Sequence, residues 1–92
     1  MDEHANNHDS VADEIAVYSI MENIAYITLT ASGLILSNRI PDVPRPVLVA
    51  AIIQLAEEFD RDFGSEAVGE DTVKEINKFA DYKLTEKFGN NH

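Results

Sequence analysis

Apolar residues recur at helical spacing through the middle of the chain, and this run is the strongest constraint on the fold. Five large side chains fall on one stripe of a helix: Leu48, Ile52, Leu55, Phe59 and Phe63. Gly64 follows the stripe as a helix stop. The run before it, residues 39–46, holds all three prolines and forms a stiff connector in which Asp42 can cap the next helix. The pattern therefore predicts a helix over residues 44–63.

A first helix is predicted upstream of this connector. A Ser-x-x-Asp pair at Ser10 is close to a capping box, and Gly33 offers a left-handed stop, so we expect a helix over residues 10–32. A hairpin over residues 24–38 is the competing interpretation, because its first half is rich in β-branched residues. We favour the helix, since an isolated two-stranded ribbon is marginal in water and no third strand candidate is present.

A third helix is predicted to complete the domain. Thr72 opens a Thr-x-x-Glu capping box and Gly89 supplies the stop, which together predict a helix over residues 72–88. Three helices in series with short connections predict an all-α array of antiparallel helices. An α+β fold that carries the hairpin is the alternative. We expect one helical domain over residues 10–89.

Both ends of the chain are polar. We expect residues 1–9, an acidic tail, and residues 90–92 to be disordered, because neither segment can offset its ordering entropy by burial. His4, His8 and His92 lie in these tails, where no scaffold would hold a general base beside a substrate. The chain also lacks a nucleophile elbow and a phosphate-binding loop. We therefore expect a protein that is not an enzyme and uses no cofactor or metal.

The charge balance is strongly acidic. The 92 residues carry 17 Asp and Glu against 7 Lys and Arg, for a formal net charge of -10. This charge disfavours direct binding to nucleic acid or to an anionic membrane. There is no cysteine, the N-terminus has no apolar run typical of a signal peptide, and the most apolar stretch, residues 47–56, is too short to span a bilayer. These features predict a cytoplasmic protein without membrane contact.

Carboxylates crowd the end of the central helix and the loop after it. Five of them form a predicted partner-binding surface, called here the acidic rim: Glu57, Glu58, Asp60, Asp62 and Glu66. Such a surface could dock on a basic or nucleic-acid-binding surface of another protein, as small acidic inhibitors do. The favoured function is therefore a small acidic protein-interaction or regulatory module.

The central helix also carries more apolar residues than one stripe requires. Val49, Ile53 and Ala56 widen its apolar surface, and a body this small is not expected to hide them all. We therefore predict that these three residues form a contact face between copies of the chain in a homo-oligomer.

Residues 40–64, IPDVPRPVLVAAIIQLAEEFDRDFG, resemble the proline-led helix of small helical head-to-tail connector proteins of tailed phages. The resemblance covers about a quarter of the chain. It implies a ring-forming structural subunit, and a structural assembly subunit is thus the first alternative function.

The acidic segment also follows the helix-loop-helix order of a calcium-binding motif. With Asp60 at the first loop position, Asp62 falls at the third and Asp71 at the twelfth. Gly64 then occupies the fifth position without a ligand, and Ser65 stands at the sixth, where the sharp turn needs glycine. A degenerate calcium-binding helix-loop-helix is therefore the second alternative.

Overall fold

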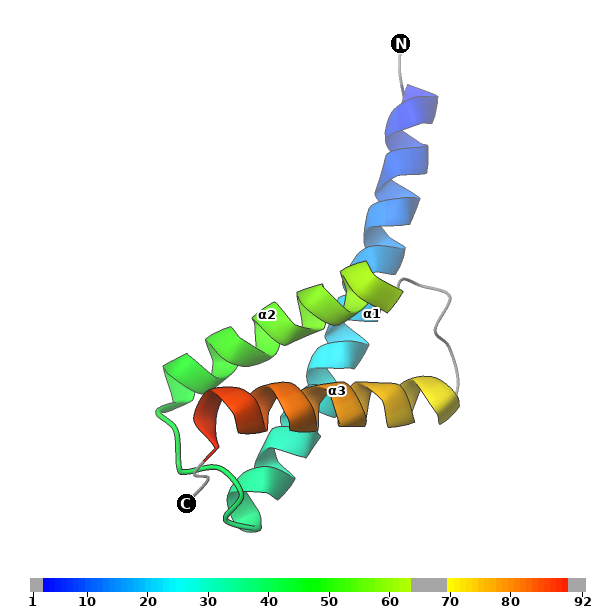
Figure 1. Ribbon diagram of the computed structural model, residues 1–92. Coiled ribbons are helices and arrows are strands. Elements are labelled where there is room, and N and C mark those ends of the chain that lie inside the picture. The colour runs from blue at the N-terminus through cyan, green and yellow to red at the C-terminus, as the bar shows by residue number, and fades with distance from the viewer. Residues whose placement is uncertain (1–2, 64–69, 90–92) are drawn as a thin grey trace.

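The protein is built from three helices (Figure 1). The computed structural model describes the backbone of residues 3–63 and 70–89, and the side chains of residue 14, residues 16–63 and residues 70–89. The helices are α1 (Glu3–Leu36), α2 (Arg45–Phe63) and α3 (Glu70–Phe88). No strand occurs in these described segments, so the all-α fold is confirmed and the hairpin alternative is wrong.

Helix α1 is longer at both ends than the sequence predicts. It spans 34 residues, beginning at Glu3 instead of Ser10, and it continues through Gly33 to Leu36. Residues 3–9, predicted as part of a tail, thus continue the helix, and its first turns project beyond α2 and α3 (Figure 1). Residues 1–2 and 90–92 lie outside the described residues. A single glycine weakens a helix by roughly 1 kcal/mol but does not end it while the following residues keep helical dihedrals.

The stop of α1 is made by Asn38 instead of Gly33. Asn38 has a φ of 61°, in the left-handed region, where asparagine is the common alternative to glycine. Its amide donates to the carbonyl of Ile35 at 3.1 Å, and the Arg39 amide donates to the carbonyl of Leu34 at 2.8 Å. These two bonds form a Schellman motif, and the buried side chains of Leu34 and Ile40 lie beside it in the core.

The left-handed residue gives a direct test of this stop. Asn38→Gly should leave the free energy of unfolding unchanged or raise it, because glycine adopts a φ of 61° without steric cost. Asn38→Ala should lower it by about 1–2 kcal/mol, because alanine pays the left-handed penalty. Urea unfolding followed by circular dichroism measures both. Equal stability of the two variants would contradict the role assigned to Asn38.

The proline-rich connector leads into α2 as expected, with a different cap. The Leu48 amide donates to the carbonyl of Pro44 at 3.0 Å, so Pro44 stands at the N-cap of a helix that begins at Arg45. Pro46 lies in the first turn, where its missing amide hydrogen costs nothing. Asp42 is exposed before the helix and is not its cap, which corrects the prediction. The bounds predicted for α2 are otherwise right within one residue.

Helices α2 and α3 lie on the same side of α1, where they run in roughly opposite directions (Figure 1). Each contacts α1 more extensively than it contacts the other. The hydrophobic core therefore lies between one face of α1 and the two shorter helices. Its buried members are Ile27, Ala31, Leu34, Ile40, Ala51, Ile52, Leu55, Ala56, Phe59, Ile76, Ala80 and Leu84.

Three phenyl rings join the end of α2 to α3. Phe59 stacks on Phe63 with ring centroids 4.4 Å apart, and the edge of Phe79 meets them at 5.6 Å from Phe59 and 6.2 Å from Phe63. The ammonium group of Lys83 lies 5.7 Å from the centre of the Phe79 ring. Edge-to-face and stacked pairs of this kind stabilise by about 0.5–1.5 kcal/mol beyond their buried area.

Two adjacent isoleucines on α2 provide a matched test of the core. Ile52 is 4% exposed and Ile53 is 42% exposed. Ile52→Ala should lower the free energy of unfolding by about 2–5 kcal/mol, because it leaves a cavity between α2 and its neighbours. Ile53→Ala should cost less than about 1 kcal/mol. Chemical denaturation measures both, and similar losses at the two positions would contradict this placement of α2.

Candidate interaction surfaces

The structure places most of the acidic rim on the last two turns of α2. Glu57 and Asp62 are exposed, while Glu58 and Asp60 are half-buried. The predicted rim residue Glu66 lies outside the described residues.

The carboxylates of Asp60 and Asp62 differ in their surroundings. An oxygen of the Asp62 carboxylate lies 3.8 Å from Nε of Arg61, and both side chains are largely exposed. Oδ1 of Asp60 is buried, and no hydrogen bond reaches it within the described part of the chain. Exposure therefore makes Glu57 and Asp62 the carboxylates most accessible to a partner.

The structure places the three residues of the predicted apolar face of α2 in different environments. Val49 and Ile53 are exposed, whereas Ala56 is fully buried. Ala56 therefore lies in the core of the single chain, and the contact between copies stays a prediction. The three residues share one side of the helix, but this side is open only along the first half of α2. At Ala56 it has reached the core, next to the buried Phe59.

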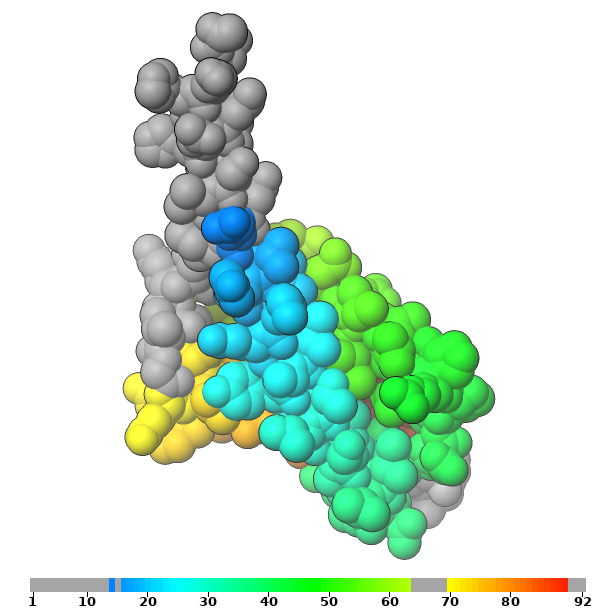
Figure 2. Space-filling model, turned by 180° about the vertical axis from the view of Figure 1, so that it is seen from behind, coloured from blue at the N-terminus to red at the C-terminus, as the bar shows by residue number. Residues whose placement is uncertain are grey.

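A second exposed apolar surface, missed by the sequence analysis, runs along α1. Figure 2 shows α1 lying uncovered across the back of the molecule, with α2 and α3 flanking it. We call this surface the outer face and define it by six exposed residues: Tyr18, Met21, Ala25, Leu29, Gly33 and Leu36. Its large apolar members are 57% to 84% exposed. At roughly 100° per residue, all six fall within an arc of about 120°, opposite the residues that enter the core. The exposed residues Glu22 and Ser32 lie within the same arc.

Helix α1 is also long and apolar enough to cross a membrane by length and composition. Among the described helices it alone meets this test, over residues Ala16–Leu36, with a mean hydropathy of 1.3 and 22% of the most apolar window buried. Core helices of soluble proteins meet the same test. The sequence analysis missed this stretch because serine, threonine and asparagine residues interrupt it.

Some of these polar side chains bond to the helix itself. The hydroxyl of Thr28 donates to the carbonyl of Ile24 at 2.7 Å. Directly after the helix, the hydroxyl of Ser37 donates to the carbonyl of Leu34 at 3.2 Å. The hydroxyl of Thr30 lies within hydrogen-bond distance of two acceptors, the Tyr26 carbonyl and the side-chain oxygen of Asn77 on α3. Its single proton can be donated to either one. Such bonds to preceding carbonyls are common for serine and threonine in helices.

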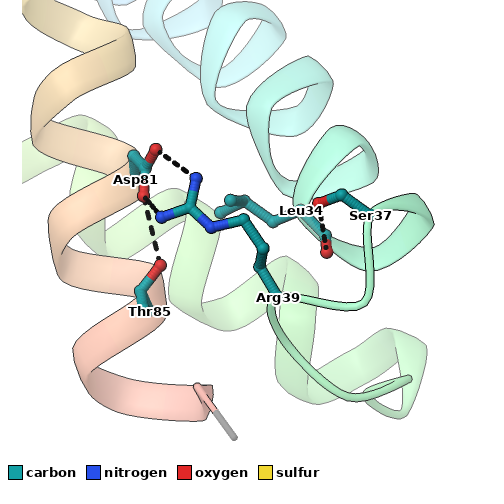
Figure 3. A network of polar contacts seen from close by, with 5 residues as sticks. All are labelled: Leu34, Ser37, Arg39, Asp81 and Thr85. Atoms are coloured by element: carbon teal, nitrogen blue, oxygen red, sulfur yellow. Dashed lines mark hydrogen bonds and ion pairs between the residues drawn. The ribbon is translucent and has the colours of Figure 1, made fainter. Parts of the chain in front are cut away.

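A polar network ties the connector to α3 (Figure 3). The guanidinium group of Arg39 donates to both carboxylate oxygens of Asp81, at 2.9 Å and 2.8 Å, and Thr85 donates to one of them at 3.2 Å. Nearby, a hydrogen bond and then the negative charge of Glu86 raise the pKa of the Tyr82 hydroxyl above 10.0. These groups line a shallow hollow of about 530 Å³. The network is a structural clamp, since its charged groups are paired with each other.

The metal hypothesis concerns residues that are only partly described. Among the described side chains, no group of three or more His, Asp or Glu residues could hold a metal ion. The loop of the calcium hypothesis spans residues 60–71, and its middle, residues 64–69, lies outside the described residues, as do the side chains of His4, His8 and His92. Calcium binding therefore stays a prediction.

Comparison with known proteins gives no guide to what these surfaces bind. No family, curated protein or solved structure matches the chain. The resemblance of residues 40–64 to phage connector proteins therefore also stays a prediction.

The clamp between Arg39 and Asp81 can be measured by a double-mutant cycle. Arg39→Gln and Asp81→Asn, alone and together, should give a coupling free energy of about 1 kcal/mol that falls with salt, because the pair is bidentate but partly exposed. The same cycle with Arg61→Gln and Asp62→Asn is the control. Its coupling should be close to zero, because that pair is longer and more exposed. Equal coupling in the two cycles would contradict the structural role of the clamp.

Proposed function

We propose that the protein is a non-enzymatic interaction module that docks a basic, partly apolar surface of another protein on α2. One observation supports this proposal above the others: a single helix exposes apolar side chains in its first half and carboxylates in its second. Val49, Ile53 and Glu57 follow one another at four-residue intervals, and all three are exposed. Residues four apart on a helix are neighbours on its surface. The apolar patch and the rim are therefore continuous.

The two halves of this surface have different physical roles. The exposed apolar residues provide binding free energy through burial. The rim carboxylates steer a basic partner and select against acidic ones, because charges at the edge of an interface act mainly on association rate and specificity. The proposal keeps the expected cytoplasmic location and requires no cofactor. A self-assembling subunit is a second candidate, favoured by the outer face of α1.

Neutralising the rim tests the proposal. Glu57→Gln, Glu58→Gln and Asp62→Asn, combined in one variant, should weaken binding of a labelled cationic amphipathic peptide of lysine and leucine by roughly tenfold, at about 0.5 kcal/mol for each of the three charges. The salt dependence of binding should fall in parallel. Fluorescence anisotropy measures both quantities. The same variant should lose partners during quantitative capture from a lysate of the native cell.

A matched control separates the rim from net charge. Asp42→Asn, Glu75→Gln and Glu86→Gln remove the same charge from exposed positions outside the rim and should bind like the unmodified protein. Ile53→Ser should weaken binding without changing its salt dependence, because it removes only apolar contact. Equal binding by the rim and control variants would show that charge acts without a defined site and would overturn the proposal.

A further inference from the structure

The outer face of α1 is a long apolar strip with almost no charge. Between Tyr18 and Leu36 the helix rises about 27 Å, at about 1.5 Å per residue. Over residues 16–36, Glu22 is the only charged residue, in a chain whose net charge is -10. A basic partner would therefore find no array of opposite charges along this strip. An apolar, uncharged surface is the complement that the outer face requires.

We propose that a second copy of this chain covers the outer face, with the two α1 helices antiparallel. Two copies repel each other over most of their acidic surfaces. The outer face is where they can approach without bringing many like charges together. The contact is independent of the docking surface proposed on α2.

The spacing of the outer face makes it complementary to itself. When two such helices are aligned antiparallel about the midpoint between Ala25 and Leu29, every residue of the face lies at the same axial level as a residue of the partner's face. The pairs that share a level are Tyr18 with Leu36, Met21 with Gly33, and Ala25 with Leu29, each formed twice. Large side chains thus share a level with small ones at two of the three pair types. This is the residue pattern that a two-fold symmetric interface requires.

The position of Glu22 selects the antiparallel orientation. A parallel, in-register pair would bring the two Glu22 carboxylates close together, at a cost in like-charge repulsion. The antiparallel pair separates them by ten residues along the helix axis, or about 15 Å. Glu22 is exposed in the single chain.

The shape of the surface agrees with this alignment. A hollow of about 470 Å³ opens beside the N-terminal half of the outer face, lined by Glu14, Val17, Tyr18 and Met21. At the other end of the face, Leu36 is 84% exposed. The antiparallel alignment carries the partner's Leu36 to this hollow. The contact is a single helix pair, smaller than most stable interfaces, so we expect a dimer that dissociates on dilution.

Sedimentation equilibrium over a range of concentrations tests the dimer. The unmodified chain should change from monomer to dimer as concentration rises, and salt should strengthen the dimer by screening the repulsion between acidic copies. Binding of a basic partner to α2 should weaken with salt, so failure of one proposal is distinguishable from failure of the other. Leu29→Glu should raise the dissociation constant by about tenfold or more, because it places a charge in an apolar contact.

Val47→Glu is the matched control, because it adds the same charge at an exposed apolar residue outside the outer face. It should change the dissociation constant much less than Leu29→Glu, and circular dichroism should show that both variants remain folded. A monomer at every concentration, or equal effects of the two substitutions, would overturn the proposal. A monomer that instead floats with phosphatidylcholine vesicles would identify lipid as the occupant and would overturn it as well.

Disulfide formation tests the orientation, because the chain contains no cysteine of its own. Tyr18→Cys and Leu36→Cys variants, made with tags of different mass and mixed under oxidising conditions, should form mainly the mixed disulfide. Tyr18→Cys should cross-link poorly to itself, because an antiparallel pair places the two copies of residue 18 far apart. Mainly self-linked products would show a parallel pair and would overturn the antiparallel arrangement.

Discussion

The fold depends on burial of one face of α1 against both shorter helices. Helices α2 and α3 make fewer contacts with each other than with α1, so the long helix supplies the wall on which both of them pack. Ile27 and Ala31 of α1 are fully buried in this wall, together with Ile76, Ala80 and Leu84 of α3. A chain of this size buries a modest share of its surface, so the loss of this contact would remove most of the core.

The same arrangement explains why the other side of α1 stays uncovered. Two helices that lie on one side of a third cannot also cover its far side, and the described chain contains no fourth helix to do so. The outer face is nevertheless apolar, and charged residues are concentrated elsewhere. The molecule thus combines an acidic body with an apolar strip that carries a single charge, Glu22, and α2 adds a smaller surface where apolar and acidic side chains meet. Both proposed contacts follow from this segregation.

The sequence predicts the bounds of the helices better than it predicts which of their side chains are buried. The bounds of α2 were nearly right because prolines and a regular apolar stripe are local signals. Gly33 was misread as a stop because the true stop, Asn38, depends on a left-handed conformation that asparagine adopts only in some contexts. Ala56 was placed on the surface because periodicity gives a side of the helix but not where a neighbour covers that side. The outer face was missed for the same reason: two apolar stripes on one helix look alike until the packing distinguishes them.

The hydroxyl groups along α1 change how its composition should be understood. Because the proton of the Thr28 hydroxyl is already donated to a carbonyl of its own helix, this side chain loses little when water is removed from around it. A hydropathy scale scores threonine as polar and so underestimates how readily this helix tolerates a dry environment. Local bonding of this kind lowers the cost of removing water from the helix when another surface covers it.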